Sequence, residues 1–373
     1  MTGGGGTSIL PSMGLLRESS SRDKQVFLWY ATVAVLFVLL YLVLFPRTLP
    51  AEFTIVPAQA VPLVDTKSDH LTAGGSFFVL GGWEGYWNAQ GQLERAQLRR
   101  PQATASGDKV AWYDASKTQV VVEGPQGPLF TIPGEQYPVW ASGRLFTVDE
   151  NRLGLKAYNP QGRLLWAKHF ASLMTAFDTS TNLTVVGTLD GKVQVFGSTG
   201  NPAGGFQPGG SRLPVIYNVA IAPHDGAILV LAGVDPKRFL VLERGGAEFR
   251  PVFHKALKES RPWPTPLGFL SGGSMAYYET EKGLAFVDPK SPEQEVVVPV
   301  QGSPLLLEAL PKAHLVVFVQ KDGENSALRV ASPDGASVLT LPFSARDLLL
   351  DLQGESLFLG VDQTLLRLEV RIQ

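Results

Sequence analysis

The longest uncharged stretch of the chain lies close to its start. Residues 26–45 read VFLWYATVAVLFVLLYLVLF and are almost all apolar, with aromatic residues near both ends. A helix rises about 1.5 Å per residue, so this stretch reaches about 30 Å, the thickness of the hydrocarbon core of a bilayer. The pattern predicts one transmembrane helix over residues 26–46. A buried core helix and a cleaved signal peptide are the alternatives, but the apolar part of a signal peptide is shorter, about 7–15 residues.

Basic residues on the two sides of this span predict its orientation. Arg17, Arg22 and Lys24 precede it, whereas Arg47 alone follows closely. Positive charges stay on the cytoplasmic side, so residues 1–25 are predicted to be a cytosolic tail, flexible because it is rich in Gly and Ser. The chain after the span is then periplasmic or extracellular, and the protein is anchored in the inner or plasma membrane by a single pass.

Beyond the span, short apolar runs alternate with turn residues at a regular spacing. Glycines of equivalent turns are separated by 36, 35 and 38 residues, at Gly91, Gly127, Gly162 and Gly200. An independent series of turns repeats eight times between residues 75 and 354. Four short strands in each unit of about 40 residues are typical of a β-propeller. Residues 52–373 are therefore predicted to form one all-β propeller with eight four-stranded blades, or seven, because the fifth and sixth units are less regular.

The two ends of this segment predict how the ring closes. The last unit, Asp347–Gln373, supplies three strands and stops. Phe53–Val56 can supply the missing outermost strand of the same blade. This pairing would cover a strand edge that otherwise invites aggregation.

One unit of the repeat resembles a known family. The stretch AYNPQGRLLWAKHF is similar to the pyrroloquinoline-quinone-like (WD40-like) propeller repeat, with Asn159, Gly162 and Trp166 at the marked places. This resemblance implies the eight-bladed, non-enzymatic propellers of the cell envelope, which include the scaffold lipoprotein of outer-membrane barrel assembly. The chain lacks that lipoprotein's lipobox cysteine and has a spanning segment instead, so the resemblance does not imply a shared partner.

Composition and charge exclude several classes of function. The formal net charge is −2 and the isoelectric point is about 6.2, so the chain lacks the positive field on which non-specific nucleic-acid binding depends. It contains no cysteine, which excludes disulfides and thiolate zinc sites. The resemblance implies that a quinone cofactor would be held by a cysteine pair, which is also absent.

The sequence offers no catalytic motif. It contains no nucleophile elbow, P-loop or dinucleotide-binding motif. The histidines fall in different units without metal-binding spacing: His70, His169, His224, His254 and His314. We therefore expect no catalytic residue, no metal, no cofactor and no enzymatic activity.

One segment departs from the repeat. Between Lys237 and Arg261, seven Lys or Arg residues stand against three Glu, and aromatic residues are interleaved with them. Residues 252–259 are predicted to form a short projecting helix; a solvated loop with its aromatic residues against the blade is the alternative. Aromatic and arginine side chains dominate interface energetics, which predicts partner binding by Phe249, Arg250, Phe253, Lys255, Lys258, Arg261 and Trp263.

These patterns together predict a membrane-anchored, extracytoplasmic propeller that acts as a protein–protein interaction scaffold in an envelope complex. One alternative is a sensor module for a small ligand or carbohydrate, with Trp83, Trp87, Trp112 or Trp140 near the mouth of the channel. Another is a lyase or hydrolase that uses carboxylates facing the channel. A pocket with convergent His and acidic groups would favour the enzyme, and an exposed apolar side patch would favour the scaffold.

Overall fold

The computed structural model describes residues 27–37 and 53–372, except Asp69, Ala115, Lys117, Ala247 and residues 259–264, 311–314 and 354–355. The chain divides into two units, Met1–Glu52 and Phe53–Gln373. In the first, residues 27–37 form a helix with exposed side chains. The rest of the predicted span, 26 and 38–46, lies outside the described residues. Within the described residues, no helix combines the length and apolar character needed to cross a membrane.

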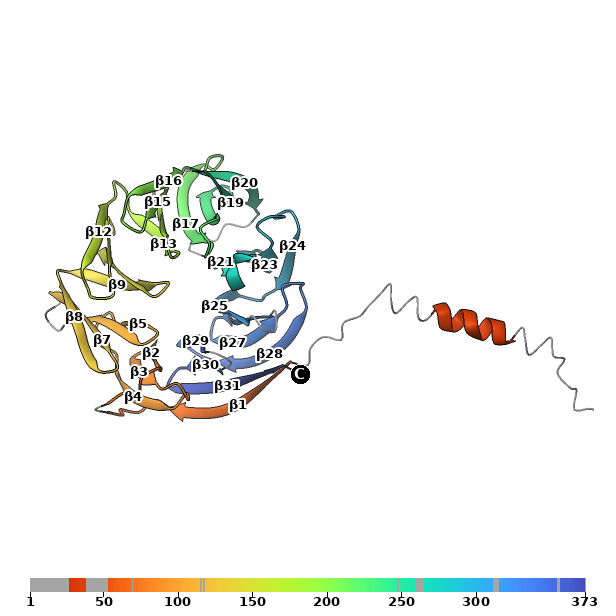
Figure 1. Ribbon diagram of the computed structural model, residues 1–373, viewed down its shortest axis with the longest axis horizontal. Coiled ribbons are helices and arrows are strands. Elements are labelled where there is room, and N and C mark those ends of the chain that lie inside the picture. Colours follow the sequence, from red (N-terminus) through yellow and green to blue (C-terminus); the bar gives the residue numbers. More distant parts are fainter. Residues whose placement is uncertain are drawn as a thin grey trace, which may run out of the picture. The chain divides into compact units, whose positions relative to one another are not determined.

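The second unit is a ring of eight antiparallel sheets, which we number as blades 1 to 8 along the chain (Figure 1). Seven sheets have four strands and one has three. The prediction of a single all-β propeller is confirmed, with eight blades and not seven. In blades 2 to 7 the first strand along the chain lies beside the central opening and the last strand lies at the periphery; in blade 8, β29 lies beside the opening and β1 at the periphery (Figure 1).

The strands of the first four blades have the following bounds. Blade 1 contains β2 (Ser76–Leu80), β3 (Trp83–Trp87) and β4 (Leu93–Leu98). Blade 2 contains β5 (Thr104–Ser106), β6 (Lys109–Tyr113), β7 (Gln119–Gly124) and β8 (Gly127–Pro133). Blade 3 contains β9 (Gln136–Ala141), β10 (Arg144–Asp149), β11 (Gly154–Tyr158) and β12 (Leu164–His169). Blade 4 contains β13 (Met174–Thr179), β14 (Leu183–Thr188), β15 (Val193–Gly197) and β16 (Pro202–Phe206).

The remaining blades complete the ring. Blade 5 contains β17 (Leu213–Ile221), β18 (Ala227–Val234), β19 (Lys237–Gly245) and β20 (Glu248–Leu257). Blade 6 contains β21 (Leu267–Leu270), the short 3₁₀ helix η1 (Ser271–Gly273), β22 (Met275–Thr280), β23 (Gly283–Val287) and β24 (Glu295–Pro299). Blade 7 contains β25 (Ser303–Leu310), β26 (Leu315–Asp322), β27 (Asn325–Ala331) and β28 (Ser337–Ser344). Blade 8 contains β29 (Leu348–Gln353), β30 (Ser356–Val361), β31 (Thr364–Ile372) and β1 (Phe53–Pro62).

Hydrophobic packing holds neighbouring blades together. The buried apolar side chains of the described residues form eight clusters, one between each pair of neighbouring blades. The middle strands β14 and β23 are buried along their whole length, because a neighbouring blade covers each of their faces. The outer strand β12 has one buried residue, Trp166, and its other residues are exposed or partly exposed. This gradient explains why the strand-like runs of the sequence differ in apolar character.

The ring closes through the pairing of its first and last strands. β1 runs antiparallel to β31, from Phe53 opposite Ile372 to Pro62 opposite Thr364. The predicted closure is confirmed, and the strand is longer than the predicted Phe53–Val56. Pro57 and Pro62 can be part of β1 because it is an edge strand, where proline is tolerated within a sheet.

Blade 1 is held on both sides although it has fewer strands. The Trp87 ring stacks on Phe358 of blade 8, with 4.4 Å between ring centroids. On the other side, the Arg100 guanidinium bridges Glu84 of β3 and Glu123 of β7, the latter at 2.8 Å. The Glu84 side chain is 2% exposed, so this ion pair is a largely buried link between blades 1 and 2.

Removing the start of β1 tests the closure. We expect deletion of residues 52–56 to lower the melting temperature by several degrees, because lost strand pairing costs a few kcal/mol and each kcal/mol is worth about 2–4 °C for a domain of this size. The measurement is a thermal melt followed by circular dichroism. Gln59→Ala, which changes an exposed side chain of the same strand, is the control and should leave the melt unchanged. An unaltered melt of the deletion variant would contradict the closure.

Candidate functional site

The segment predicted to bind a partner is part of blade 5. Residues 248–257 form β20, which pairs with β19 from Lys237 opposite Leu257 to Gly245 opposite Glu248. The predicted helix over residues 252–259 is therefore wrong in its described part. The ladder with β19 satisfies the backbone of this segment, and that pairing overrides the local preference of a stretch rich in Lys and Glu.

The aromatic residues of this segment belong to the blade core. Phe249 is 3% exposed, and the Phe253 ring packs edge-on against Phe239. Lys255 forms an ion pair with Glu295 of β24. The exposed members of the predicted set are Arg250 and Lys258, and the predicted contacts Arg261 and Trp263 lie outside the described residues. Partner binding by this segment stays a prediction, which now depends on basic residues and not on Phe249 or Phe253.

An exposed apolar patch lies where blades 4 and 5 meet. Leu173 precedes β13, Leu189 follows β14, and Leu213 begins β17; their exposed fractions are 43%, 44% and 47%. The Leu189 backbone N–H donates to the Leu173 carbonyl at 2.8 Å. A Cβ atom added to Gly191 would collide with the carbonyl oxygen of Pro214, so the turn after Leu189 touches the start of β17. We call these three leucines the leucine patch.

Ion pairs border the leucine patch. The Lys192 ammonium lies 2.7 Å from the Asp190 carboxylate, and the Arg212 guanidinium lies 2.9 Å from the Asp235 carboxylate. An apolar centre with a charged rim is the usual anatomy of a protein interface. Sequence reasoning missed this patch because the three leucines are far apart in the chain and none belongs to a long apolar run. Leu189, an apolar residue directly beside the Asp190–Gly191 turn, was the one indication in the sequence of an exposed apolar surface.

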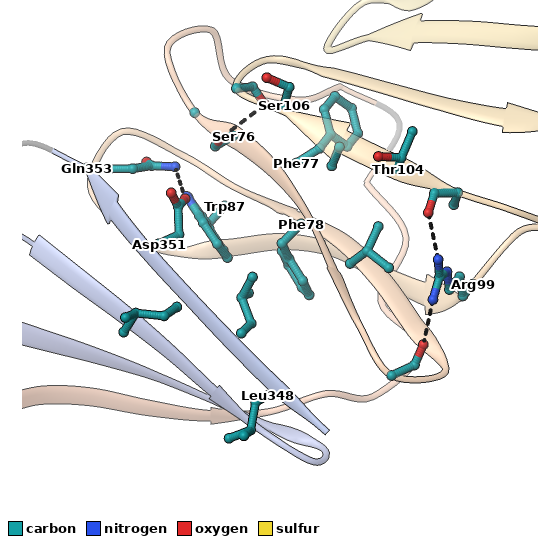
Figure 2. A pocket seen from close by; sticks show the side chains of 18 of the residues that line it. Ser76, Phe77, Phe78, Trp87, Arg99, Thr104, Ser106, Leu348, Asp351 and Gln353 are labelled. Carbon is teal, nitrogen blue, oxygen red and sulfur yellow. Dashed lines mark hydrogen bonds between the residues drawn. The ribbon is translucent and has the colours of Figure 1, made fainter. Parts of the chain in front are cut away.

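A cavity of about 1010 Å³ opens on the central side of blade 1 (Figure 2). Its walls come from β2 and from the innermost strands of the two neighbouring blades, β5 and β29. Asp351 of β29 accepts a hydrogen bond from the Gln353 side chain at 3.0 Å. The labelled residues of Figure 2 that line the cavity from these strands are Ser76, Phe77, Phe78, Thr104, Ser106, Leu348, Asp351 and Gln353.

The innermost strands of blades 2 to 8 carry acidic and no basic side chains. Within their described bounds there is no Lys, Arg or His, but there are three carboxylates, Asp178 on β13, Glu308 on β25 and Asp351 on β29. Burial raises the pKa of each of these carboxyl groups. Burial and then the charge of Asp351 raise the pKa of Glu308 to about 7.

A tyrosine links these carboxylates electrostatically. Burial, followed by the charges of Glu308 and Asp178, raises the pKa of Tyr277 to about 12. Tyr277 on blade 6 therefore lies within electrostatic range of carboxylates on two other blades, Glu308 and Asp178. Among the residues that the structure describes, no group of three His, Asp or Glu side chains could hold a metal ion.

The four tryptophans considered for a ligand site do not gather at one place. Trp87 is fully buried, and Trp83 packs against the cluster between blades 1 and 8. Trp112 lies under the Arg100 guanidinium, 3.3 Å from the ring centroid. Trp140 donates its indole N–H to a backbone carbonyl of β5. Their common role in the structure is packing between blades, and ligand binding by any of them stays a prediction.

Comparisons with known proteins agree with this architecture. A family model described as "beta-propeller protein" matches residues 21–373. An uncharacterized protein of Treponema pallidum (strain Nichols) is 22% identical over 294 residues, which cover 79% of this chain and 78% of that protein. BamB from Moraxella catarrhalis superposes with a TM-score of 0.60 at 9% identity, covering 85% of this chain and 100% of BamB.

The computationally designed Ika8 protein superposes with a TM-score of 0.59 at 15% identity, covering 83% of this chain and 99% of its own. At these identities the superpositions establish the fold alone. The match of the family model confirms the predicted resemblance to β-propeller proteins.

The raised pKa of Glu308 generates a pH-dependent prediction. A carboxyl group whose pKa is about 7 when folded and near 4.5 when unfolded stabilises the fold at low pH and loses that contribution as the pH rises from about 4.5 to 7. Glu308→Gln should therefore increase the free energy of unfolding at pH 8, by at most about 3 kcal/mol and less where water screens the partly buried group. At pH 4.5 the gain should vanish.

Urea unfolding of the wild type and the variant at both pH values measures this difference. Glu150→Gln removes an exposed carboxylate and is the matched control, for which we expect the same small change at either pH. If Glu308→Gln increased the free energy of unfolding equally at pH 4.5 and pH 8, the raised pKa of Glu308 would be contradicted.

Proposed function

Because the chain belongs to a family of β-propeller proteins whose model matches residues 21–373, we propose that it is a membrane-anchored, extracytoplasmic scaffold that binds other proteins of the cell envelope. The proposal includes the absence of enzymatic activity. A propeller suits this role because its rigid blades hold loops and turns at fixed positions, where they present binding surface without needing reactive groups.

The leucine patch is the observation that carries the proposal. Three leucines that are each more than two-fifths exposed lose contact with water when a partner covers them, and burying one such side chain is worth about 1.5–3 kcal/mol. Both side chains of the Arg212–Asp235 ion pair beside them are exposed. The pair can therefore steer the encounter with a partner and favour a charged one. The leucine patch lies at the boundary between blades 4 and 5, so a partner can cover it without disturbing the buried core.

Two lines of reasoning support the anchor and the location. Residues 26–45 have the length and apolar character of a membrane span, and basic residues predominate before it. Residues 27–37 of this stretch are helical, with exposed Phe, Leu and Trp side chains, as expected for a helix that has lipid as its surroundings.

The alternatives have weaker support. A sensor would gather its tryptophans near the channel, whereas Trp83, Trp87, Trp112 and Trp140 take part in packing at separate places. A lyase or hydrolase would need paired acid and base groups. Glu308 and Asp351 do interact, but the innermost strands of blades 2 to 8 carry no His or Lys within their described bounds.

The partner prediction concerns the leucine patch. We expect Leu173→Glu combined with Leu189→Glu to weaken partner binding by at least about 2 kcal/mol, because the new charges would have to be buried in the interface. The measurement is quantitative mass spectrometry of proteins that co-purify from membranes solubilised in mild detergent. Leu164→Glu with Leu165→Glu, two equally exposed leucines on β12, is the matched control. If the control variant loses the same partners or the patch variant retains them, the patch is not the interface.

The anchor prediction concerns the first 51 residues. We expect the full-length protein to stay in the membrane fraction after an alkaline carbonate wash, and a chain that begins at Glu52 to be released. Protease added from the outside should remove the propeller and spare the tail. Retention of the shortened chain would reject the anchor, and digestion of the tail alone would reverse the orientation.

A further inference from the structure

Another cavity, of about 690 Å³, opens where strand ends of blades 7, 8 and 1 come together. Its lining residues come from the turn between β26 and β27, the connection between β28 and β29, the turn between β30 and β31, and the paired ends of β3 and β4. Sites for small molecules have volumes of about 300–1,000 Å³. The cavity therefore has the size of a ligand site.

Part of the cavity wall is apolar. Trp83 and Leu98 are directly opposite each other on β3 and β4, so their side chains lie on the same face of blade 1. Both line the cavity. Trp83 is only partly buried, and Leu98, at 75%, is the most exposed large apolar side chain of the described propeller residues. The pair leaves apolar area in contact with water that a ligand would cover.

Two polar groups of the wall are held in place by the backbone. The Asp362 carboxylate accepts the backbone N–H groups of Arg346 and Asp347 at 2.8 and 2.9 Å, both through Oδ1. These bonds, followed by the charges of Arg346 and Lys321, lower the pKa of Asp362. The Lys321 ammonium donates to the Arg346 carbonyl at 2.7 Å. An acceptor and a donor are thus fixed before a ligand binds.

Charges of both signs line the cavity. Lys321 and Arg346 stand against Glu324, Asp347 and Asp362, and no ion pair joins any two of these five described side chains. A charged ligand would be attracted by one set and repelled by the other. Carboxylates only accept hydrogen bonds, whereas ammonium and guanidinium groups only donate them. This set favours a neutral ligand whose groups both donate and accept, as hydroxyl groups do.

We propose that this cavity binds a neutral saccharide, with a sugar ring against the Trp83 indole and hydroxyl groups on Asp362 and Lys321. A sugar ring carries hydroxyl groups at its rim and C–H groups on its faces, so it fits an indole face beside fixed donors and acceptors. A peptide fits less well, because strand ends and turns line the cavity and no strand runs along it for a main chain to pair with.

Saccharide binding goes beyond the proposed scaffold function and does not depend on it. One tryptophan at the strand ends is enough for such a site, so the site requires no group of tryptophans at the channel.

Calorimetric titration with defined trisaccharides tests the site. The protein is the full-length chain in a polyoxyethylene detergent, because a detergent with a sugar headgroup would compete. The neutral probes are cellotriose and chitotriose. The charged probes are trigalacturonate and the glucosamine trimer, which is chitotriose without its acetyl groups. We expect at least one neutral trisaccharide to bind, about fivefold or more tightly than either charged one.

Matched variants test the apolar wall. Trp83→Ala should weaken binding by about tenfold or more, because it removes the indole face. Trp83→Phe keeps an aromatic face and should change the affinity by less than about threefold. Thermal melts check the fold of each variant. If Trp83→Ala does not fold, Leu98→Ala changes an exposed side chain of the same wall and should weaken binding by about threefold or more.

A second pair of variants tests the polar wall. Asp362→Asn keeps an oxygen for the two backbone N–H groups but removes the charge and the second acceptor, so it should weaken binding about tenfold. Asp334→Asn is the control, since Asp334 is an exposed carboxylate that accepts a backbone N–H in a turn of blade 7 and does not line the cavity. We expect it to leave the affinity unchanged.

Four results would overturn saccharide binding at this site. They are no binding of cellotriose or chitotriose, equal binding of a charged trisaccharide, unchanged affinity of a folded Trp83→Ala protein, and tighter binding of the uncharged peptide acetyl-Ser-Leu-Ser-amide, which would assign the cavity to a peptide. Leu173→Glu with Leu189→Glu should leave saccharide affinity unchanged. Failure of the leucine patch to bind a partner and failure of the cavity to bind a sugar are therefore separate results.

Discussion

The pairing of β1 with β31 is the interaction on which the rest of the structure depends. Blade 8 receives three strands from the end of the chain and its fourth from residues 53–62. Without this pairing, β31 would be an open edge and the first and last blades would separate more easily. Each hydrophobic cluster lies between two blades, so every blade depends on both neighbours, and closure stabilises the whole ring.

Closure also determines what the centre of the ring contains. The innermost strands of blades 2 to 8 lie beside the opening (Figure 1), and the charge of Asp351 on blade 8 raises the pKa of Glu308 on blade 7. Burial disfavours their charged forms. Blade 1 has only three strands. The stacking of Trp87 on Phe358 of blade 8 and the ion pair of Arg100 with Glu123 of blade 2 hold it between its neighbours. A blade that is anchored on both sides can have three strands without opening the ring.

The two candidate surfaces differ in physical character. The leucine patch lies at strand ends, before β13, after β14 and at the start of β17, and suits apolar contact with a folded partner. The cavity beside β2 is lined by β2, β5 and β29 and by charged side chains of both signs, Arg99, Arg346, Asp347 and Asp351.

The sequence by itself determined the repeat and the closure of the ring, whereas it allowed eight blades or seven and the structure decided for eight. Turn glycines such as Gly91 and Gly162, both at φ +77°, are required locally, so their spacing is readable along the chain. Phe53–Val56 was recognisable because Asp347–Gln373 is one strand short. Only the tertiary structure decided that residues 252–257 pair with β19, that Phe249 is buried, and that the backbone of Leu189 bonds to that of Leu173. These depend on contacts between segments far apart in the chain, and no local pattern encodes which distant backbone will pair with a strand or which isolated leucines will share a surface.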